Sequence, residues 1–226
     1  MNKLRLLPYT NRGFTLTELS IVLVIVALLI SGMMIPISAQ RDIQNISETG
    51  KRMNEIKEAL LGFAVLYGRL PCQSSTVDPT DPKYGVENSP CDDAEGYLPW
   101  KTLGVGEIDA WGTPRTAAGD PFRGYWRYRV VKEYAAAFAL PAPPASPPAS
   151  ALVVQDASGN NLTTANPDGP IAIVYSTGPD LTPNGQNATI DATFQAGERA
   201  VGFDDMLVWI SRPILFNRMI AAGKLP

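Results

Sequence analysis

The sequence contains no histidine and only two cysteines. Without histidine the chain lacks the commonest general base, and both a Ser-His-Asp triad and a histidine-containing zinc site are excluded. Two cysteines cannot form a zinc site made of cysteine alone. A Gly-rich phosphate-binding loop of the Walker type is also missing from the sequence. These absences argue against an enzyme, although they leave chemistry by Asp and Glu open.

Charge is sparse and nearly balanced, with 19 Lys and Arg residues against 22 Asp and Glu residues and a formal net charge of −3. A protein that binds nucleic acid through its backbone phosphates needs a concentrated basic face. The sequence shows no such concentration, so we expect no nucleic-acid partner.

Charged residues are entirely absent from residues 19–39. At ~1.5 Å per residue, an α-helix of that length covers roughly 30 Å, the hydrocarbon thickness of a bilayer. Residues 21–30 are apolar on every helical face, so they require lipid or a helix bundle on all sides. Lys3, Arg5 and Arg12 precede the run, which favours a cytoplasmic N-terminus and places the rest of the chain across the membrane.

Three interpretations of this N-terminal stretch compete. A cleaved secretory signal peptide has a shorter apolar region with a small-residue cleavage site after it, and no convincing site follows here. An ordinary membrane anchor explains the length and the cations but gives no role to Gly13, Phe14 and Glu18. The third interpretation uses all three residues, because the sequence from Arg12 to Glu18 reads Arg-Gly-Phe-Thr-Leu-Thr-Glu.

This pattern resembles the start of type IV pilin and pseudopilin precursors, which carry a short basic leader, a Gly, and Phe-Thr-Leu-x-Glu at the opening of an apolar helix. The resemblance implies that residues 1–13 form a leader, which the prepilin peptidase removes by cutting between Gly13 and Phe14. It also implies N-methylation of the new amine on Phe14. Glu18 would pair with the N-terminal ammonium of a neighbouring subunit, since a bare carboxylate at the edge of hydrocarbon is costly. The alternative is that Glu18 only reaches to the lipid headgroups.

Helical periodicity continues beyond the apolar run. Apolar residues recur mostly at steps of three, four or seven through residues 40–67, and charged residues fill the other faces. The expected buried stripe consists of Ile43, Ile46, Met53, Ile56, Leu60, Phe63 and Tyr67. We predict one helix over residues 15–66: residues 14–39 form its membrane or filament-core part, residues 40–67 its amphipathic part, and Gly68 its end.

Residues 68–226 are expected to form one globular domain in the periplasm or outside the cell. Its loop-rich beginning holds Cys72 and Cys91, which can oxidise in that compartment. A disulfide there would enclose about 20 residues and stabilise the domain by roughly 3 kcal/mol. The alternative is a pair of free thiols.

Several further segments have local signals. Asp109-Ala110-Trp111-Gly112-Thr113-Pro114 resembles the Asp-x-Trp-Gly-x-Pro segment that precedes the first sheet strand of pseudopilins, especially the major pseudopilin of type II secretion. We expect Trp111, like Trp100, to pack in the interior. Residues 139–150 hold five prolines and predict an exposed, extended loop.

Alternating residues predict a half-buried strand at 125–131, with Trp126, Tyr128 and Val130 inside and with Arg127 and Arg129 on a solvated face. The alternative is that the two arginines form a partner-binding face. Residues 152–154 and 171–175 predict further strands in antiparallel pairing. Residues 206–210 predict a last strand, followed by a helix. That helix begins at Ser211, buries Ile214, Leu215, Met219 and Ile220, and ends at Gly223.

The loop at residues 176–185 is the most site-like part of the domain, because it carries many side-chain oxygens on a turn-rich backbone. In pseudopilins a loop of this kind, closed by an Asp pair before the last strand, holds Ca²⁺. Asp180, Asp204 and Asp205 would provide the charge, and carbonyl groups could complete the six to eight oxygens that calcium needs. The alternative is a plain turn, in which Asp and Asn have only local roles.

Together these observations predict an α+β fold in which a long N-terminal helix packs on a small antiparallel sheet and a short helix closes the chain. The resemblance implies a single-pass protein of the bacterial inner membrane that assembles with other pilin or pseudopilin subunits. The assembly would be a type IV filament or the pseudopilus of a type II secretion system. Two alternatives stay open: a minor pilin that acts as an adhesin or in DNA uptake, and a membrane-tethered periplasmic enzyme.

Overall fold

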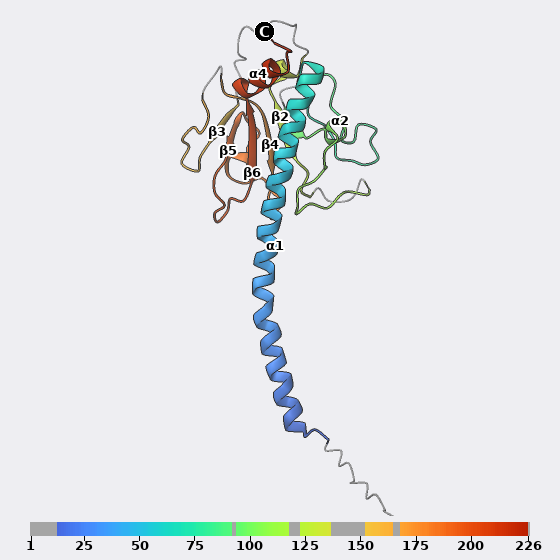
Figure 1. Ribbon diagram of the computed structural model, residues 1–226, viewed down its shortest axis with the longest axis vertical. Helices are drawn as coiled ribbons and strands as arrows, with labels where there is room; N and C mark the ends of the chain where they lie inside the picture. The colour runs from blue at the N-terminus through green and yellow to red at the C-terminus, as the bar shows by residue number, and fades with distance from the viewer. Residues whose placement is uncertain (1–12, 92–93, 118–122, 137–151, 165–167, 226) are drawn as a thin grey trace, which may run out of the picture. The chain divides into compact units, whose positions relative to one another are not determined.

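The computed structural model describes residues 13–91, 94–117, 123–136, 152–164 and 168–225, without the side chains of residues 32–39 (Figure 1). The chain divides into two compact units, residues 1–44 and 45–226. Helix α1 (Leu16–Tyr67) contributes to both. The predicted leader up to residue 12 and the proline-rich loop at 139–150 lie outside the described residues.

The predicted helix over residues 15–66 is confirmed by α1. Within the second unit its buried stripe is Met53, Ile56, Leu60 and Phe63, as the periodicity indicates. The expected burial of Ile43 and Tyr67, at the two ends of the stripe, is wrong, since they are 66% and 56% exposed. Tyr67 lies against Phe63 at the surface, with ring centroids 4.3 Å apart, instead of entering the core.

The main sheet has four antiparallel strands in the order β1-β2-β4-β6. They are β1 (Gly96–Tyr97), β2 (Arg127–Val130), β4 (Pro170–Ser176) and β6 (Met206–Ser211). All seven residues of β4 are buried, which fits a strand with neighbours on both edges and layers on both faces. The sequence predicts β2, β4 and β6 but gives no signal for the two-residue β1.

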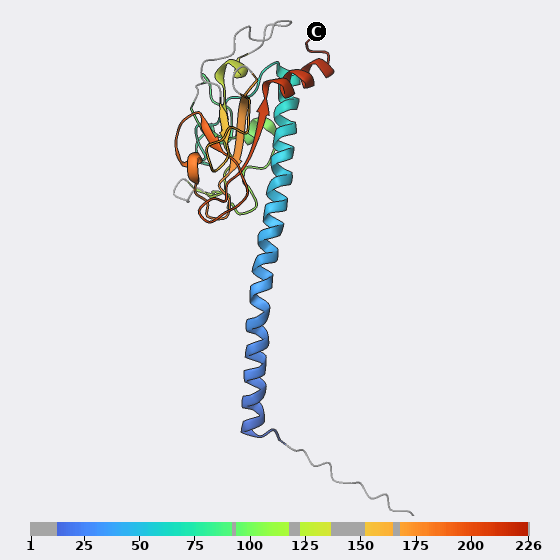
Figure 2. The same ribbon diagram turned by 90° about the vertical axis from the view of Figure 1, so that its left-hand side faces the viewer.

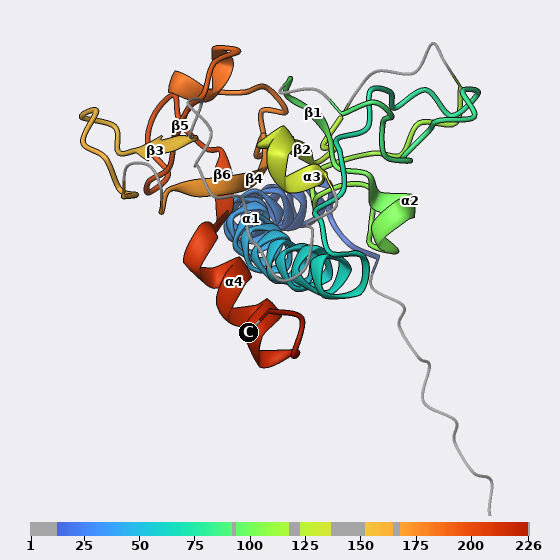
Figure 3. The same ribbon diagram turned by 90° about the horizontal axis from the view of Figure 1, so that it is seen from above.

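The expected pairing of residues 152–154 with 171–175 is wrong. Strand β3 (Val153–Gln155) pairs in parallel with β5 (Thr193–Gln195) and forms a separate two-stranded sheet. Seen from above, this small sheet lies on one face of the main sheet, and α1 and α4 (Arg212–Ala221) lie on the other (Figure 3). The small sheet thereby covers the second face of β4, which antiparallel pairing along the chain would have left open.

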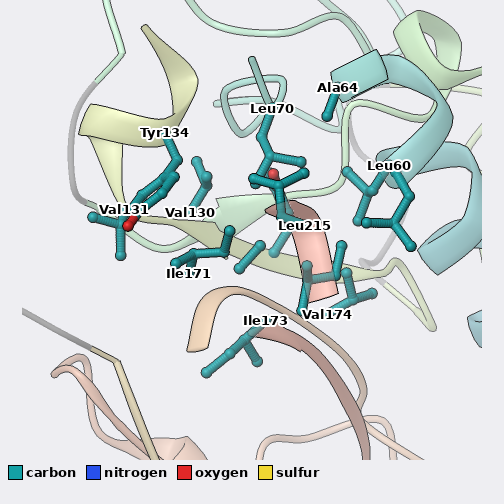
Figure 4. Close-up of a cluster of buried hydrophobic side chains, with 14 of the residues drawn as sticks. Leu60, Ala64, Leu70, Val130, Val131, Tyr134, Ile171, Ile173, Val174 and Leu215 are labelled. Atoms are coloured by element: carbon teal, nitrogen blue, oxygen red, sulfur yellow. The ribbon is translucent and has the colours of Figure 1, made fainter. Parts of the chain in front are cut away.

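The core lies between the helices and the main sheet. In Figure 4, Leu60 and Ala64 of α1 and Leu215 of α4 lie over Val130, Ile171 and Val174 of the strands. A second cluster, formed by Val77, Tyr84, Trp100 and Tyr125, lies among the loops and the short helix α2 (Trp100–Leu103). Trp100 is therefore buried as expected, whereas Trp111 is only half-buried and belongs to neither set of buried residues.

Helix α4 follows β6 directly and runs beside the last turns of α1 (Figure 2). Ser211 is its N-cap and Pro213 lies in its first turn, as predicted, but the Ser211 side chain makes no capping hydrogen bond. Leu215 and Met219 are buried, while the expected burial of Ile214 and Ile220 is wrong, since these are 40% and 50% exposed. The predicted disulfide between Cys72 and Cys91 is present. Two further short helices, α3 (Lys132–Ala135) and η1 (Gly185–Ala188), complete the described elements.

Candidate functional site

The predicted cleavage junction lies on a short non-helical segment before α1. Gly13, Phe14 and Thr15 precede the first helical residue, Leu16. The Phe14 side chain is 88% exposed. A peptide bond outside regular hydrogen-bonded structure is accessible to an enzyme that needs an extended backbone, so the geometry of this junction fits proteolysis.

Glu18 is part of a reciprocal cap on the first turn of α1. Its Oε2 accepts hydrogen bonds from the Thr15 backbone N–H and from Thr15 Oγ1, both at 2.8 Å. The Glu18 N–H donates to Thr15 Oγ1 at 3.3 Å. This is the capping box predicted by Ser/Thr-x-x-Glu, a signal that is present in the sequence but that our sequence analysis did not use. Glu18 Oε1 makes no hydrogen bond to any of the described residues.

The helix that follows presents apolar side chains to its surroundings in every direction. Between Leu19 and Ile30, the large apolar side chains on all faces of α1 are exposed, from Val26 at 43% to Leu28 at 69%. Among the described residues, no helical stretch combines the length and the hydropathy that crossing a membrane requires.

A second candidate site lies in the globular domain, where the structure brings together the three predicted calcium ligands. Asp205 Oδ2 accepts hydrogen bonds from the Asn184 N–H at 2.9 Å and from Asn187 Nδ2 at 2.9 Å. Asp180 Oδ2 accepts one from Asn184 Nδ2 at 3.0 Å, and the Asp204 N–H donates to Asn184 Oδ1 at 3.0 Å. Asn184 thus links all three aspartates and ties the loop to the Asp204–Asp205 pair.

Close approach at Gly178 makes this closure possible. Gly178 has a φ of +64°, and a Cβ on it would lie 2.6 Å from the Asp204 carbonyl oxygen. Only glycine fits there, because any side chain would meet backbone and would also strain the left-handed conformation. Leu181, three residues further on, adopts a positive φ of 62° despite its side chain. The loop is therefore held in a conformation that its residues do not favour locally.

Two carboxylate oxygens of this site are buried without a partner. Asp204 Oδ1 and Asp205 Oδ1 make no hydrogen bond within the described part of the chain. Burial raises the pKa of Asp205 to about 6, and the charges of Asp204 and Asp180 act in the same direction. Burial and the charge of Asp180 also raise the pKa of Asp204. A buried carboxylate oxygen without a donor is costly, and a bound cation would remove that cost.

These residues fit a calcium ion through the chemistry of their donors. The described residues contain no group of three or more His, Cys, Asp or Glu side chains placed to hold a metal ion. Calcium does not require three such side chains, because backbone carbonyls, amide oxygens and water can complete its coordination. Among the described residues, Asp204 Oδ1 and Asp205 Oδ1 are the oxygens of this loop that are buried without a donor.

A buried aspartate next to this loop was missed as a structural centre. Asp109 is 1% exposed, and its Oδ1 accepts hydrogen bonds from the backbone N–H groups of Trp111 and Gly112 at 3.0 and 2.8 Å. Its Oδ2 accepts one from Ser176 Oγ, at the end of β4, at 2.6 Å. In the Asp-x-Trp-Gly-x-Pro segment the structural centre is thus the first residue, Asp109, which closes an Asx turn, and not the tryptophan.

The same turn is attached to α1. Arg52 Nη1 donates to the carbonyl oxygens of Ile108 and Asp109 at 3.1 and 3.2 Å, and the Ala110 N–H donates to Thr49 Oγ1 at 3.2 Å. Asp109 and its neighbours therefore join the helix, the turn and the central strand.

The expected solvated face is wrong at Arg127. Arg127 Nε donates to Glu95 Oε1 at 2.8 Å, and the Glu95 side chain is only 3% exposed. Tyr175 OH donates to the same oxygen at 2.8 Å. Arg129 donates to the Asp191 carbonyl oxygen. Alternation in the sequence identifies the apolar face of β2 but gives no indication that the opposite face is covered by other segments.

The structure is that of an α+β protein. Its helix α1 has a capping box formed by Thr15 and Glu18 and carries exposed apolar side chains on every face of its first part. The family model for the prokaryotic N-terminal methylation motif matches residues 9–34, which include Gly13, Phe14 and Glu18. This motif is characteristic of type IV pilins and pseudopilins. No curated protein and no solved structure matches the chain.

Proposed function

We propose that the protein is a structural subunit of a type IV filament or of a type II secretion pseudopilus, processed by the prepilin peptidase and assembled through its N-terminal helix. The observation that carries the proposal is the methylation motif at residues 9–34, at the start of a helix whose apolar side chains are exposed on every face. Such a helix needs an apolar environment, which lipid provides before assembly and neighbouring helices provide afterwards.

Processing begins at the junction of Gly13 and Phe14. Hydrolysis of this peptide bond leaves a carboxylate on Gly13 and a free amine on Phe14, which becomes the methylated N-terminus. The non-helical backbone of residues 13–15 supports this step. The new ammonium then lies one residue before Thr15, at the same helix end as Glu18.

Glu18 can serve two purposes at once. Its Oε2 is engaged in the cap with Thr15, whereas its Oε1 is available to a cation from outside the chain. In the proposed assembly the ammonium of a neighbouring Phe14 binds Oε1 and sets the axial register between subunits. Charge-assisted hydrogen bonds of this kind are strong where water is excluded.

The proposed location before assembly is the inner membrane, with the globular domain in the periplasm. Support comes from the sequence: residues 19–39 carry no charge, and three cations precede them. A disulfide in the domain agrees with an oxidising compartment.

Mass spectrometry of the mature protein from its native cells tests the processing. We expect an N-terminus at N-methyl-Phe14; an intact precursor in cells that contain the peptidase would contradict the proposal. Cross-linking to co-purified subunits then distinguishes a pilus from a secretion pseudopilus.

We further propose that the loop at residues 176–185 holds Ca²⁺, with Asp204 and Asp205 as its carboxylate anchors and Asp180 close by. The unpartnered oxygens of the Asp pair support this assignment. A bound calcium ion would neutralise the clustered charge and fix the loop against β6. Titration calorimetry of the full chain with CaCl₂ tests the site; no heat and no change in Tm would exclude it.

A further inference from the structure

An open groove lies beside the free edge of the main sheet. Strand β6 ends the strand order, so its outer edge has no neighbour in that sheet. The groove has a volume of about 410 Å³ and runs between this edge and α1. Its apolar lining comes from Ile46 and Met53 of α1 and from Met206, Leu207 and Val208 of β6. We call it the α1–β6 groove.

The strand that lines this groove, β6, is apolar along most of its length. Met206, Leu207, Val208 and Trp209 follow one another in β6, and all four are only half-buried. An exposed hydrophobic edge strand promotes association with other chains unless something covers it. Natural sheets protect such edges with charge, proline or a short strand, and β6 has none of these over its six residues.

Two glycines leave room for a close approach. Gly50 lies in the groove on α1, where a Cβ would meet only the Met206 Cε at 3.9 Å. Gly197 also lines the groove, and a Cβ there would have no atom within 4 Å. Small residues let the backbone of a packed helix come near, and this is the usual composition of tight helix contacts in apolar surroundings.

The first part of α1 is also apolar and exposed, and it requires an apolar environment. The described side chains of residues 16–31 are exposed around the whole helix. We propose that the α1–β6 groove receives this apolar N-terminal segment of α1 from a second copy of the chain. The inference rests on the proposed function, since only an assembly brings the two surfaces together.

Helix continuity identifies the occupant as a second copy. Residues 16–31 belong to the same α-helix as Ile46, Gly50 and Met53, and an α-helix cannot turn back on itself without breaking. Burying apolar area from both partners favours the contact, because the groove wall and the helix lose exposed hydrocarbon together. Arg199, Asp205 and Asn54 lie among the lining residues and mark its polar border.

Photo-cross-linking in the full-length protein tests the contact directly. A benzoylphenylalanine probe at Asn54 lies in the groove, whereas a probe at the neighbouring Glu55 lies on α1 outside it. In cells that express two differently tagged copies, we expect the Asn54 probe to attach to a peptide from residues 16–31 of the other copy. We expect the Glu55 probe to give little of this product.

Filling the groove provides a second measurement. Gly50→Leu places a side chain in the groove, and its matched control Gly62→Leu places the same side chain on α1 at a position where a Cβ has no atom within 4 Å. Both changes replace a helical glycine with a better helix former, so neither should lower Tm. We expect Gly50→Leu to reduce incorporation into filaments several-fold and to abolish the Asn54 cross-link, with Gly62→Leu close to wild type.

The outcomes separate the two proposals. Equal cross-linking from Asn54 and Glu55, a product with lipid or with a different protein alone, or normal incorporation of Gly50→Leu overturns the groove proposal while leaving the subunit assignment intact. A wild-type protein that is never cut at Gly13 or never assembles overturns both.

Discussion

Replacing Asp205 with Asn should stabilise the protein at neutral pH in the absence of divalent cations. Asp205 is 2% exposed, and burial raises its pKa to about 6, compared with roughly 3.9 in an unfolded chain. The folded state therefore holds the proton more tightly than the unfolded state. This contribution to stability is fully present below about pH 4 and is lost as the pH rises through about 6.

The size of this contribution follows from the two pKa values of Asp205, about 6 when folded and roughly 3.9 when unfolded. Their difference corresponds to roughly 3 kcal/mol in the free energy of unfolding. Asn cannot ionise, and its oxygen can still accept the hydrogen bonds that Asn184 and Asn187 donate to Asp205. Asp180 and Asp204 titrate in both proteins, so their contributions largely cancel in the comparison. The stability of wild type relative to Asp205→Asn should fall by up to about 3 kcal/mol between pH 4 and pH 7.

The assay is urea unfolding of the full chain in detergent, followed by tryptophan fluorescence at several pH values with EDTA. A difference between the two proteins that stays constant from pH 4 to pH 7 would refute the burial argument. Repeating the series with millimolar CaCl₂ at pH 7 tests the metal proposal. Calcium should stabilise wild type through mass action and leave Asp205→Asn unchanged.

Four other outcomes are expected. Glu18→Gln keeps an acceptor for the cap with Thr15 but removes the charge, so it should impair filament incorporation nearly as much as Glu18→Ala; normal incorporation of the Gln variant in a pull-down of filaments would reject the ion pair. Replacing both Cys72 and Cys91 with Ser should lower the free energy of unfolding by roughly 2–4 kcal/mol, measured by urea titration, and reduction of wild type should reproduce this loss. Arg127→Ala should cost about 3–5 kcal/mol because it leaves the Glu95 carboxylate buried and unpaired, and adding Glu95→Gln should restore much of the loss; no restoration would contradict the pairing. Ser176→Ala should cost roughly 1–3 kcal/mol by removing a donor to Asp109, and an unchanged melting curve would show that the contact is unimportant.

The helices and the central strands could be predicted from the sequence because their signals are local. The stripe from Met53 to Phe63 has a helical period, and the alternation around Tyr128 and the apolar run in β4 need no knowledge of distant residues. The motif at Gly13 and Phe14 is local as well, and the family match confirms it.

The errors concern features that depend on partners far apart in the chain. The sequence predicted a solvated Arg127, because no local pattern indicates that Glu95, 32 residues earlier in the chain, binds it. The parallel pairing of β3 with β5 joins segments about 40 residues apart, which tight spacing along the chain cannot indicate. At Asp109 the sequence does contain a local signal, because Asp commonly closes turns. The prediction rested on packing of the large Trp111 instead, whereas Asp109 accepts the hydrogen bonds that hold the turn.

The connection between α1 and the central strand has a mechanical consequence. Arg52 and Thr49 attach the helix to the turn at residues 108–110, and Asp109 attaches that turn to Ser176 of β4. If the proposed filament were pulled, the force would act along α1 of each subunit. The polar linkage would then resist displacement of the helix together with the apolar contacts of Leu60 and Ala64. In the proposed filament this linkage would oppose sliding of α1 along the sheet, because displacing the helix would break these hydrogen bonds as well as the apolar contacts.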